Sequence, residues 1–262
     1  MLVRGVHPGE NTESRSLGCR CDTLPPAAHR LHARGPRPFL TWYGSDGERI
    51  ELSASVTANW VAKTTGLLVE EHDAAAGMFV HLDLPAHWRT AVWALATWRV
   101  GAGIVLDASA PADVVVTDRP AEVAAGTVPD VDAAGAEVVA QVVPSLARAF
   151  DGELPSGVSD AARAVASYPD VIGYVPPTDP SAAAVVIGGE SIPHDLLHTW
   201  AREVPASSRL AMTVGLRSPG GIEVFCATVL GALAANSSLV LLGPGHPDLD
   251  RVHATENATL LH

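Results

Sequence analysis

Residues 89–106 read RTAVWALATWRVGAGIVL, and residues 224–241 read VFCATVLGALAANSSLVL. Each stretch begins with a run that is apolar on nearly every side, is interrupted by small or polar residues, and ends in branched aliphatic residues. A helix that is apolar all round is buried between layers, and a short aliphatic run after it is typical of a buried strand. The stretches lie about 135 positions apart, so the sequence predicts a duplicated helix-to-strand unit.

Shorter apolar segments flank both stretches. Residues 39–43 and 49–52 enclose a polar turn with glycine, which predicts a β-hairpin. A helix is predicted over residues 53–71, with Val56 and Trp60 on its buried face. The other predicted strands lie at 78–82, 104–106, 112–117, 137–143, 182–187, 210–214, 239–242 and 258–261, and the other predicted helices at 88–100, 160–167, 193–203, 222–235 and a short last one opened by Pro247.

Strands and helices alternate through most of this order, which favours parallel sheets joined by right-handed crossovers. We therefore predict an α/β fold, in which duplicated βαβ units form layered, mostly parallel sheets with helices between and outside them, plus an N-terminal β-hairpin. Prolines concentrated between residues 169 and 180 predict a linker without regular structure. The predicted organisation is a disordered leader over 1–35, a first α/β subdomain over 36–175 and a second over 176–262.

The charge balance is acidic, with 17 basic residues, 29 acidic residues and a net charge of −12. Nucleic-acid binding needs a concentrated positive face, so we expect no nucleic-acid partner. Three cysteines do not make a disulfide framework, and residues 1–24 hold no apolar run suited to a signal peptide, so we expect a cytoplasmic protein. Residues 222–242 are interrupted by Asn236-Ser237-Ser238, which favours helix, turn and strand over a membrane span.

The hairpin, the helix-to-strand step over residues 94–106, the segment at 191–197 (SIPHDLL) and the second step over 230–242 follow one another in an order known from other proteins. Over residues 30–262 this order resembles the N-terminal domain of the adenylate-forming superfamily, the AMP-dependent synthetases and ligases that include acyl-CoA synthetases, adenylation domains and luciferases. The resemblance implies the layered fold, ATP or AMP as cofactor, and a small acyl or nucleotide ligand.

One segment departs from that superfamily. Its phosphate loop is rich in Ser, Thr and Gly and ends in Pro-Lys-Gly, because backbone amides, hydroxyls and the lysine hold the phosphates. The corresponding residues 187–191 read IGGES, which is shorter, has no lysine and carries a carboxylate at Glu190. Lys63 is the only lysine in the chain and belongs to an early helix. The resemblance also places the later nucleotide and magnesium motifs and the small C-terminal domain outside this sequence, so residues 176–262 are expected to be incomplete relative to the superfamily.

Two segments remain candidates for holding a phosphate or another anion through backbone amides. One is the shortened loop, and the other opens the second apolar helix. The candidate cofactor-binding residues are Gly188, Gly189, Ser191, Ser218, Gly220 and Gly221. We assign no catalytic residue and no metal ligand, because the pairs His194/His198 and Asp248/Asp250 are better explained as helix surface. Cys226 is predicted to be core.

These residues predict a degenerate acyl-CoA-synthetase-like domain without autonomous adenylation, a pseudoenzyme with at most weak acyl or nucleotide binding. One alternative is half of an ATP-dependent acid ligase that needs a partner chain. Another is a structural or protein-interaction module. Glu190 and the single lysine argue against the ligase, because phosphate transfer needs electrostatic stabilisation, whereas the sequence does not separate the degenerate domain from the interaction module.

Overall fold

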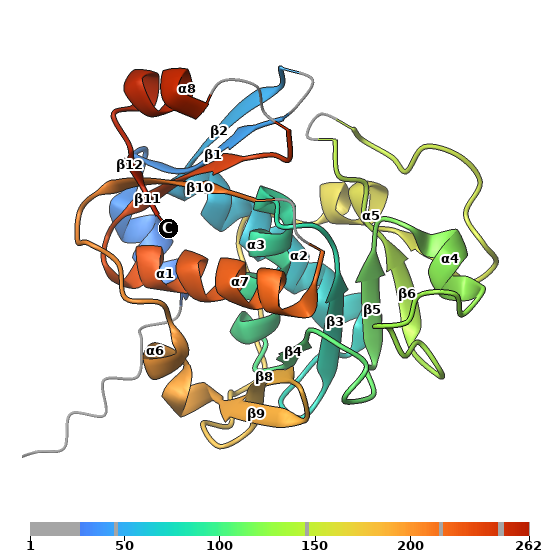
Figure 1. The fold of residues 1–262 in the computed structure, drawn as a ribbon. Helices are drawn as coiled ribbons and strands as arrows, with labels where there is room; N and C mark the ends of the chain where they lie inside the picture. Colours follow the sequence, from blue (N-terminus) through green and yellow to red (C-terminus); the bar gives the residue numbers. More distant parts are fainter. Residues whose placement is uncertain (1–26, 45–46, 145–146, 215–216, 246–248, 262) are drawn as a thin grey trace, which may run out of the picture.

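The computed structural model describes residues 27–44, 47–144, 147–214, 217–245 and 249–261. Over these residues the chain forms two sheets with helices between and outside them (Figure 1). The predicted α/β class with largely parallel sheets is confirmed, since the antiparallel pairs within the described chain are the hairpins β1–β2 and β8–β9. No helix of this described part combines the length and the apolar character that a bilayer span requires.

The first sheet has five strands in the order β12-β10-β11-β1-β2. Its strands are β1 (Pro38–Tyr43), β2 (Arg49–Ser53), β10 (Arg209–Thr213), β11 (Ser238–Leu242) and β12 (Thr259–Leu260). The second sheet has seven strands in the order β7-β6-β5-β3-β4-β8-β9. Its strands are β3 (Phe79–Asp83), β4 (Gly103–Val105), β5 (Val114–Thr117), β6 (Glu137–Ala140), β7 (Ser159–Asp160), β8 (Ala183–Ile187) and β9 (Glu190–Pro193).

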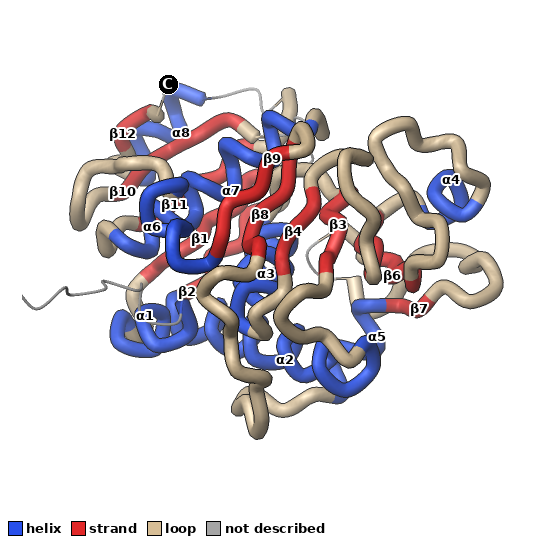
Figure 2. The backbone as a smooth tube through the Cα atoms, turned by 90° about the horizontal axis from the view of Figure 1, so that it is seen from below, coloured by secondary structure: helices blue, strands red, loops and turns tan. Residues whose placement is uncertain are grey.

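Helices fill the space between the sheets and cover their outer faces. The helices are α1 (Ala27–Arg34), α2 (Ala54–His72), α3 (Trp88–Arg99), α4 (Pro120–Ala124), α5 (Ala161–Ser167), α6 (Leu197–Trp200), α7 (Pro219–Ala234) and α8 (Leu249–Glu256). Figure 2 shows α2, α3 and α5 on one side of the seven-stranded sheet and α4 on the other. α3 contacts strands of both sheets, so it lies at the centre of the molecule.

Side-chain alternation in the strands explains these layers. In β5, Val114 and Val116 belong to the main core, whereas Val115 packs with Val123 of α4. In β11, Leu239 and Leu241 belong to the main core, whereas the residues between and after them pack under α8 with Val252. Successive residues of a strand point to opposite faces, so an uninterrupted aliphatic strand must be covered on both sides.

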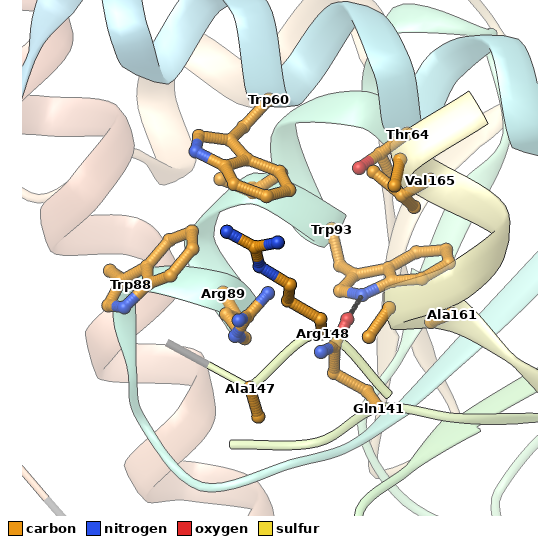
Figure 3. Close-up of a pocket in the computed structure, with 13 residues that line it drawn as sticks. Trp60, Thr64, Trp88, Arg89, Trp93, Gln141, Ala147, Arg148, Ala161 and Val165 are labelled. Atoms are coloured by element: carbon orange, nitrogen blue, oxygen red, sulfur yellow. Dashed lines mark hydrogen bonds between the residues drawn. The ribbon is translucent and has the colours of Figure 1, made fainter. Parts of the chain in front are cut away.

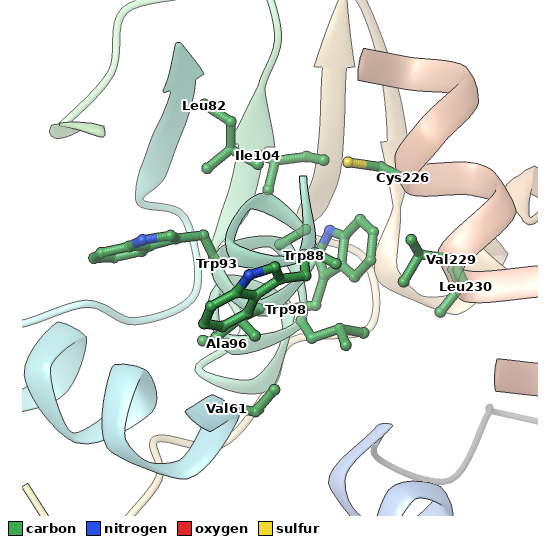
Figure 4. Close-up of a cluster of buried hydrophobic side chains, with 14 of the residues drawn as sticks. Val61, Leu82, Trp88, Trp93, Ala96, Trp98, Ile104, Cys226, Val229 and Leu230 are labelled. Carbon is green, nitrogen blue, oxygen red and sulfur yellow. The ribbon is translucent and has the colours of Figure 1, made fainter. Parts of the chain in front are cut away.

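The two stretches that predict the fold form α3–β4 and α7–β11, and their helices are buried nearly all round. The N-terminus of α3 is capped by the ring of His87, which accepts a hydrogen bond from the Arg89 amide at 3.2 Å. Pro219 stands in the first turn of α7, where a missing N–H costs nothing. Figure 4 shows how their side chains meet: the indoles of α3, Ile104 of β4 and the Cys226 and Leu230 side chains of α7 form one core.

The sheets do not follow the predicted subdomains 36–175 and 176–262. β1 lies beside β11, with Leu40 opposite Leu239, and β4 lies beside β8, with Ile104 opposite Val185. The hairpin thus completes a sheet made mostly of late strands, and two late strands complete the early sheet. Apolar patterns identify buried strands but carry no information on which distant strand is the neighbour.

Two local predictions are wrong. Helix α1 lies inside the predicted leader and buries Leu31 completely, while residues 1–26 lie outside the described part. In α2, Val56 is 41% exposed and Trp60 is half-buried, although both were assigned to the buried face. The apolar face of α2 is instead made of small residues and leucines, because α1, α3 and α5 approach it from different directions.

A cluster of charges joins α8 to the first sheet. The Glu256 carboxylate accepts hydrogen bonds from Arg49 (2.9 Å), from Arg209 (3.1 Å between Nε and Oε2) and from the Tyr43 hydroxyl. Its side chain is only 7% exposed. Burial acts to raise the pKa of Glu256, but these hydrogen bonds outweigh burial and lower it to about 2. The ionised carboxylate therefore stabilises the folded chain.

We expect Glu256→Gln to lower the free energy of unfolding by about 1–2 kcal/mol at pH 7. Because the pKa of the folded state lies below the unfolded value, the stabilisation is complete above pH 5 and is lost as pH falls towards 2. Urea unfolding of wild type and variant at pH 7 and at pH 3.5 should show the difference shrinking in acid. Glu153→Gln, at an exposed position, is the control; a difference that does not depend on pH would contradict this account.

Candidate functional site

The segment in place of a phosphate loop is a two-residue turn between β8 and β9. Ile187 pairs directly with Glu190, so only Gly188 and Gly189 connect the strands. Both glycines have positive φ, +59° and +78°, as in the tight hairpin turns that require glycine. Ser191, one of the candidate cofactor-binding residues, is an exposed strand residue opposite Val186. A strand forms here because residues 190–193 complete the edge of the sheet beside β8.

The turn is closed by a carboxylate from another strand. Asp107 follows β4, and its Oδ2 accepts a hydrogen bond from the Gly188 amide at 2.7 Å. Asp107 also accepts bonds from the amide of Ser109, at 3.0 Å, and from the Ser109 hydroxyl. Burial acts to raise the pKa of Asp107, but the bonds from Ser109 and Gly188 outweigh it and hold the pKa below its ordinary value. The first amide of the turn therefore already donates its hydrogen bond to an ionised carboxylate.

The second candidate segment forms the N-terminus of α7. Ser218 is the N-cap, and its hydroxyl accepts a hydrogen bond from the Gly221 amide at 3.3 Å. The Gly221 amide also donates to the Ser218 carbonyl at 2.8 Å. Since Pro219 has no N–H, the amide of Gly220 is what this first turn offers to a ligand.

The two candidate segments lie at the carboxyl ends of strands in the seven-stranded sheet. Gly188 follows β8 at its carboxyl end, and Arg217, just before α7, pairs with Asp118 at the carboxyl end of β5 (2.7 Å between Nη1 and Oδ1). β3 and β4 stand between β5 and β8, so these strand ends are about 14 Å apart. The structure thus places the two segments over different strands.

Charged residues also gather where β3 and β5 end. Arg119 donates two hydrogen bonds to the buried carboxylate of Asp83, at 3.0 and 2.6 Å, and the Thr117 hydroxyl donates a third at 2.6 Å. Strand connections leave in opposite directions at this point, which is where open α/β sheets bind ligands. Here Arg119 and Thr117 already satisfy Asp83, which makes this cluster a structural one.

The histidines and the cysteine singled out in the sequence have local roles. The His194 ring contacts the Gly101 carbonyl at 3.1 Å, and the His198 ring contacts the Asp195 carbonyl at 2.8 Å. Within the described residues no three metal-ligating side chains come together, and Asp248 lies outside them. Cys226 is fully buried, and burial raises the pKa of its thiol to about 12, which confirms a core position.

A cavity of about 320 Å³ lies between α2, α3, α5 and the chain that follows β6 (Figure 3). Three indole rings form its main walls: Trp60 from α2, and Trp88 and Trp93 from α3. The Trp60 and Trp88 rings are 5.6 Å apart and tilted by 59°. The remaining lining residues are Thr64, Arg89, Val92, Gln141, Ala147, Arg148, Ala161, Ala162, Val165 and Ala166.

The walls of the cavity are held in place by hydrogen bonds. The Trp93 indole donates to Gln141 Oε1 at 2.8 Å, and the Gln141 amide group donates to the Val142 carbonyl at 2.7 Å. Ala161 opens α5, whose N-cap Asp160 accepts from the amide of Ala162 at 2.9 Å. The small residues of α5 face the indoles and leave the space open.

Two arginines give the cavity positive charge. The Arg89 guanidinium lies 4.5 Å from the Trp88 ring centre and 5.7 Å from that of Trp60, and it contacts the Pro144 carbonyl at 3.5 Å. Burial lowers the pKa of Arg89 to about 10, so the group remains charged at neutral pH. Figure 3 shows the Arg148 guanidinium directed among the indoles from the opposite wall.

Sequence reasoning missed both the cavity and the carboxylate at the turn. Arg89 could have indicated the cavity, because a charged residue at the start of an otherwise apolar buried helix must be compensated by polar or aromatic partners nearby. Asp107 could have indicated the carboxylate, because an Asp two residues before Ser109 and directly after a strand is typical of an Asx turn. Arg148 carried no such signal, since it stands in a segment without periodicity, and Gln141 lies in the predicted strand over 137–143, where nothing marks it as part of a cavity.

Comparison with known proteins gives one clear sequence relative. A Mycobacterium tuberculosis (strain ATCC 25618 / H37Rv) protein called a TIGR03089 family protein is 38% identical over 237 residues, which cover 87% of this chain and 93% of that protein. No protein-family profile matches the chain.

Solved structures share the fold. A Brucella canis acyl-CoA synthetase matches 90% of this chain with a TM-score of 0.70 and 18% identity, and acetoacetyl-CoA synthetase from Streptomyces lividans matches 86% with a TM-score of 0.64 and 17% identity. This chain spans about half the length of these enzymes, 47% of the first and 41% of the second. The likeness places the two sheets and their helices in the acyl-CoA synthetase fold.

Proposed function

Because this chain belongs to the TIGR03089 family and has the fold of the N-terminal part of the acyl-CoA synthetases, we propose that it is a member of the adenylate-forming superfamily that does not adenylate carboxylic acids by itself. It keeps the scaffold as a binding domain. The observation that carries the proposal is the two-residue turn at Gly188–Gly189 with Asp107 bonded to its first amide.

The turn has too few groups to hold a triphosphate. A phosphate-binding loop presents several consecutive amides and a cation to the phosphate oxygens. Here the Gly188 amide already donates to Asp107, and the turn ends at Gly189 because Glu190 is paired in β9. The short connection supports the proposal on geometry alone.

The charges around the turn act in the same direction. The Asp107 carboxylate is ionised at neutral pH and lies within hydrogen-bond distance of the turn, and Glu190 is exposed beside it. Attack of a carboxylate on the α-phosphate of ATP, with pyrophosphate leaving, builds further negative charge in the transition state, which must be stabilised by several kcal/mol. Two carboxylates at this place raise that barrier.

The only lysine of the chain is engaged elsewhere. Lys63 forms an ion pair with Asp170 at 3.1 Å and donates a hydrogen bond to the Tyr168 carbonyl. These contacts tie α2 to the segment that follows α5 and hold the lysine in a structural role.

The test is pyrophosphate exchange by the purified full chain with Mg²⁺, ATP and a panel of fatty, aromatic and amino acids. We expect no exchange above a sample without protein, while an acyl-CoA synthetase assayed in parallel gives a robust signal. We also expect no thermal shift with millimolar ATP and Mg²⁺, whereas a ligand at 100 times its Kd would stabilise the fold by about 2.7 kcal/mol.

Exchange catalysed by the chain alone would refute the proposal, and its loss on mutation of Ser191 would place the activity at the shortened loop. If exchange appears only after a second protein is added, the chain is half of an acid ligase and the binding-domain interpretation falls.

A further inference from the structure

We propose that the cavity between α2, α3 and α5 is a binding site for a small planar aromatic anion. The site is distinct from the Gly188–Gly189 turn and needs neither ATP nor adenylation. Its recognition elements are the three indoles, for the ring of the ligand, and the two arginines, for its charge.

The shape of the cavity selects a small flat molecule. Its volume of about 320 Å³ is at the lower end of small-molecule sites, enough for one or two fused rings with a short substituent. Indole faces prefer offset or edge contact with another aromatic ring, each worth about 0.5–1.5 kcal/mol beyond the area buried. The Trp60 and Trp88 rings, tilted by 59° at 5.6 Å, offer a face and an edge to the same ligand.

The charge of the cavity selects an anion. Of its lining residues two are arginines and none is acidic, although the chain as a whole carries a net charge of −12. The acidic group whose charge acts on Arg89 is Glu48, which accepts a hydrogen bond from Trp42 and is not part of the lining. The residues that line the cavity therefore carry a net positive charge.

Arg89 is already oriented for such a ligand. The contacts with the Trp88 ring and the Pro144 carbonyl hold its guanidinium at the wall, so little rotamer freedom is lost on binding. Charge-assisted hydrogen bonds in a partly desolvated site are roughly twice as strong as neutral ones. Arg148 is exposed, with no ion pair seen to it within the described residues, and its guanidinium already points among the indoles, where it can donate to the bound anion (Figure 3).

The partly exposed side chain of Trp60 marks where a ligand enters the cavity. It is half-buried rather than fully buried, on the same helix whose exposed Val56 departs from the predicted apolar face. An indole that is partly exposed beside a cavity serves as one side of its mouth, and the exposed Ala166 of α5 borders the cavity as well.

Isothermal titration calorimetry with the full chain tests the site, using indole-3-acetate as the probe. Indole, which lacks the charge, and octanoate, which lacks the ring, are the comparison ligands. Indoxyl sulfate distinguishes an aromatic carboxylate from an aromatic sulfate. We expect indole-3-acetate or indoxyl sulfate to bind at least tenfold more tightly than both comparison ligands, and the tighter of the two identifies the anionic group.

Arg148→Ala is the diagnostic variant, because this exposed residue can be removed without opening the core. We expect it to weaken binding of the aromatic anion by about 10- to 100-fold, the loss of a charge-assisted hydrogen bond. Arg163→Ala removes the same charge from an exposed position of α5 outside the cavity and should bind as wild type does. Ala162→Trp, with its melting temperature checked, should fill the cavity and abolish binding.

The proposal is overturned if indole binds as tightly as the anions, if octanoate equals them, if Arg148→Ala and Arg163→Ala bind alike, or if no probe binds. None of these outcomes bears on pyrophosphate exchange, so the site and the proposed absence of adenylation stand or fall separately.

Discussion

Gly231→Ala should lower the free energy of unfolding by about 3 kcal/mol, although alanine is the better helix former by about 1 kcal/mol. Gly231 lies in the last turn of α7, where the backbone of Arg202 approaches the helix closely. A Cβ atom at this position would lie 1.9 Å from the Arg202 carbonyl oxygen, so the helix and this segment must separate. The separation strains the hydrogen bond from the Arg202 amide to the Ala227 carbonyl, now 2.9 Å.

Urea unfolding followed by circular dichroism measures this effect. Gly220→Ala is the matched control in the same helix, because a Cβ atom there meets nothing within 4 Å. We expect the control to change stability by less than about 0.5 kcal/mol, as exposed substitutions usually do. If Gly231→Ala is as stable as Gly220→Ala, the backbone of Arg202 does not approach α7 as closely as the structure shows.

Leu95→Ala should cost about 2–5 kcal/mol, since it leaves a cavity in a core that is covered on every side. Leu95 is fully buried in α3, the helix that contacts strands of both sheets. The cost should lie in the upper part of that range, because α3 is enclosed by helix α2 and by strands of both sheets, and the strands cannot relax without breaking strand pairs.

Leu196→Ala makes the same chemical change at a side chain that is 46% exposed, and we expect a cost below about 1 kcal/mol. The comparison is made by urea unfolding with one protein preparation for each variant. Equal costs at the two positions would mean that α3 does not lie between the sheets.

Local sequence patterns predicted the helices and strands whose formation depends only on the residues of their own segment. The hairpin, α3–β4 and α7–β11 were predicted to within a few residues, and both helices and the strands that follow them are buried as expected. Hydrophobic period and capping residues act over a few positions of the chain, so such elements can be derived without knowing their neighbours. The helix predicted over residues 193–203 is shorter than expected, and Pro193 belongs to β9, because residues 190–193 pair with β8.

The residues of the cavity could not be predicted in this way. Trp60, Arg89 and Gln141 stand on three elements separated by tens of residues, and nothing in their own segments indicates that they meet. A periodic pattern tells which face of a helix is buried, but it does not tell where packed faces leave a space.

The sequence by itself determined the α/β class, the two buried helices with the strands that follow them and the lack of a lysine in residues 187–191, because each depends on residue types within a short stretch. Only the tertiary structure decided that β1 completes the late sheet, that Asp107 closes the turn 81 residues further along the chain, and that three indoles and two arginines share one cavity. The physical reason is that these contacts depend on the shapes of surfaces from distant parts of the chain. Those surfaces exist only once the helices and strands have packed.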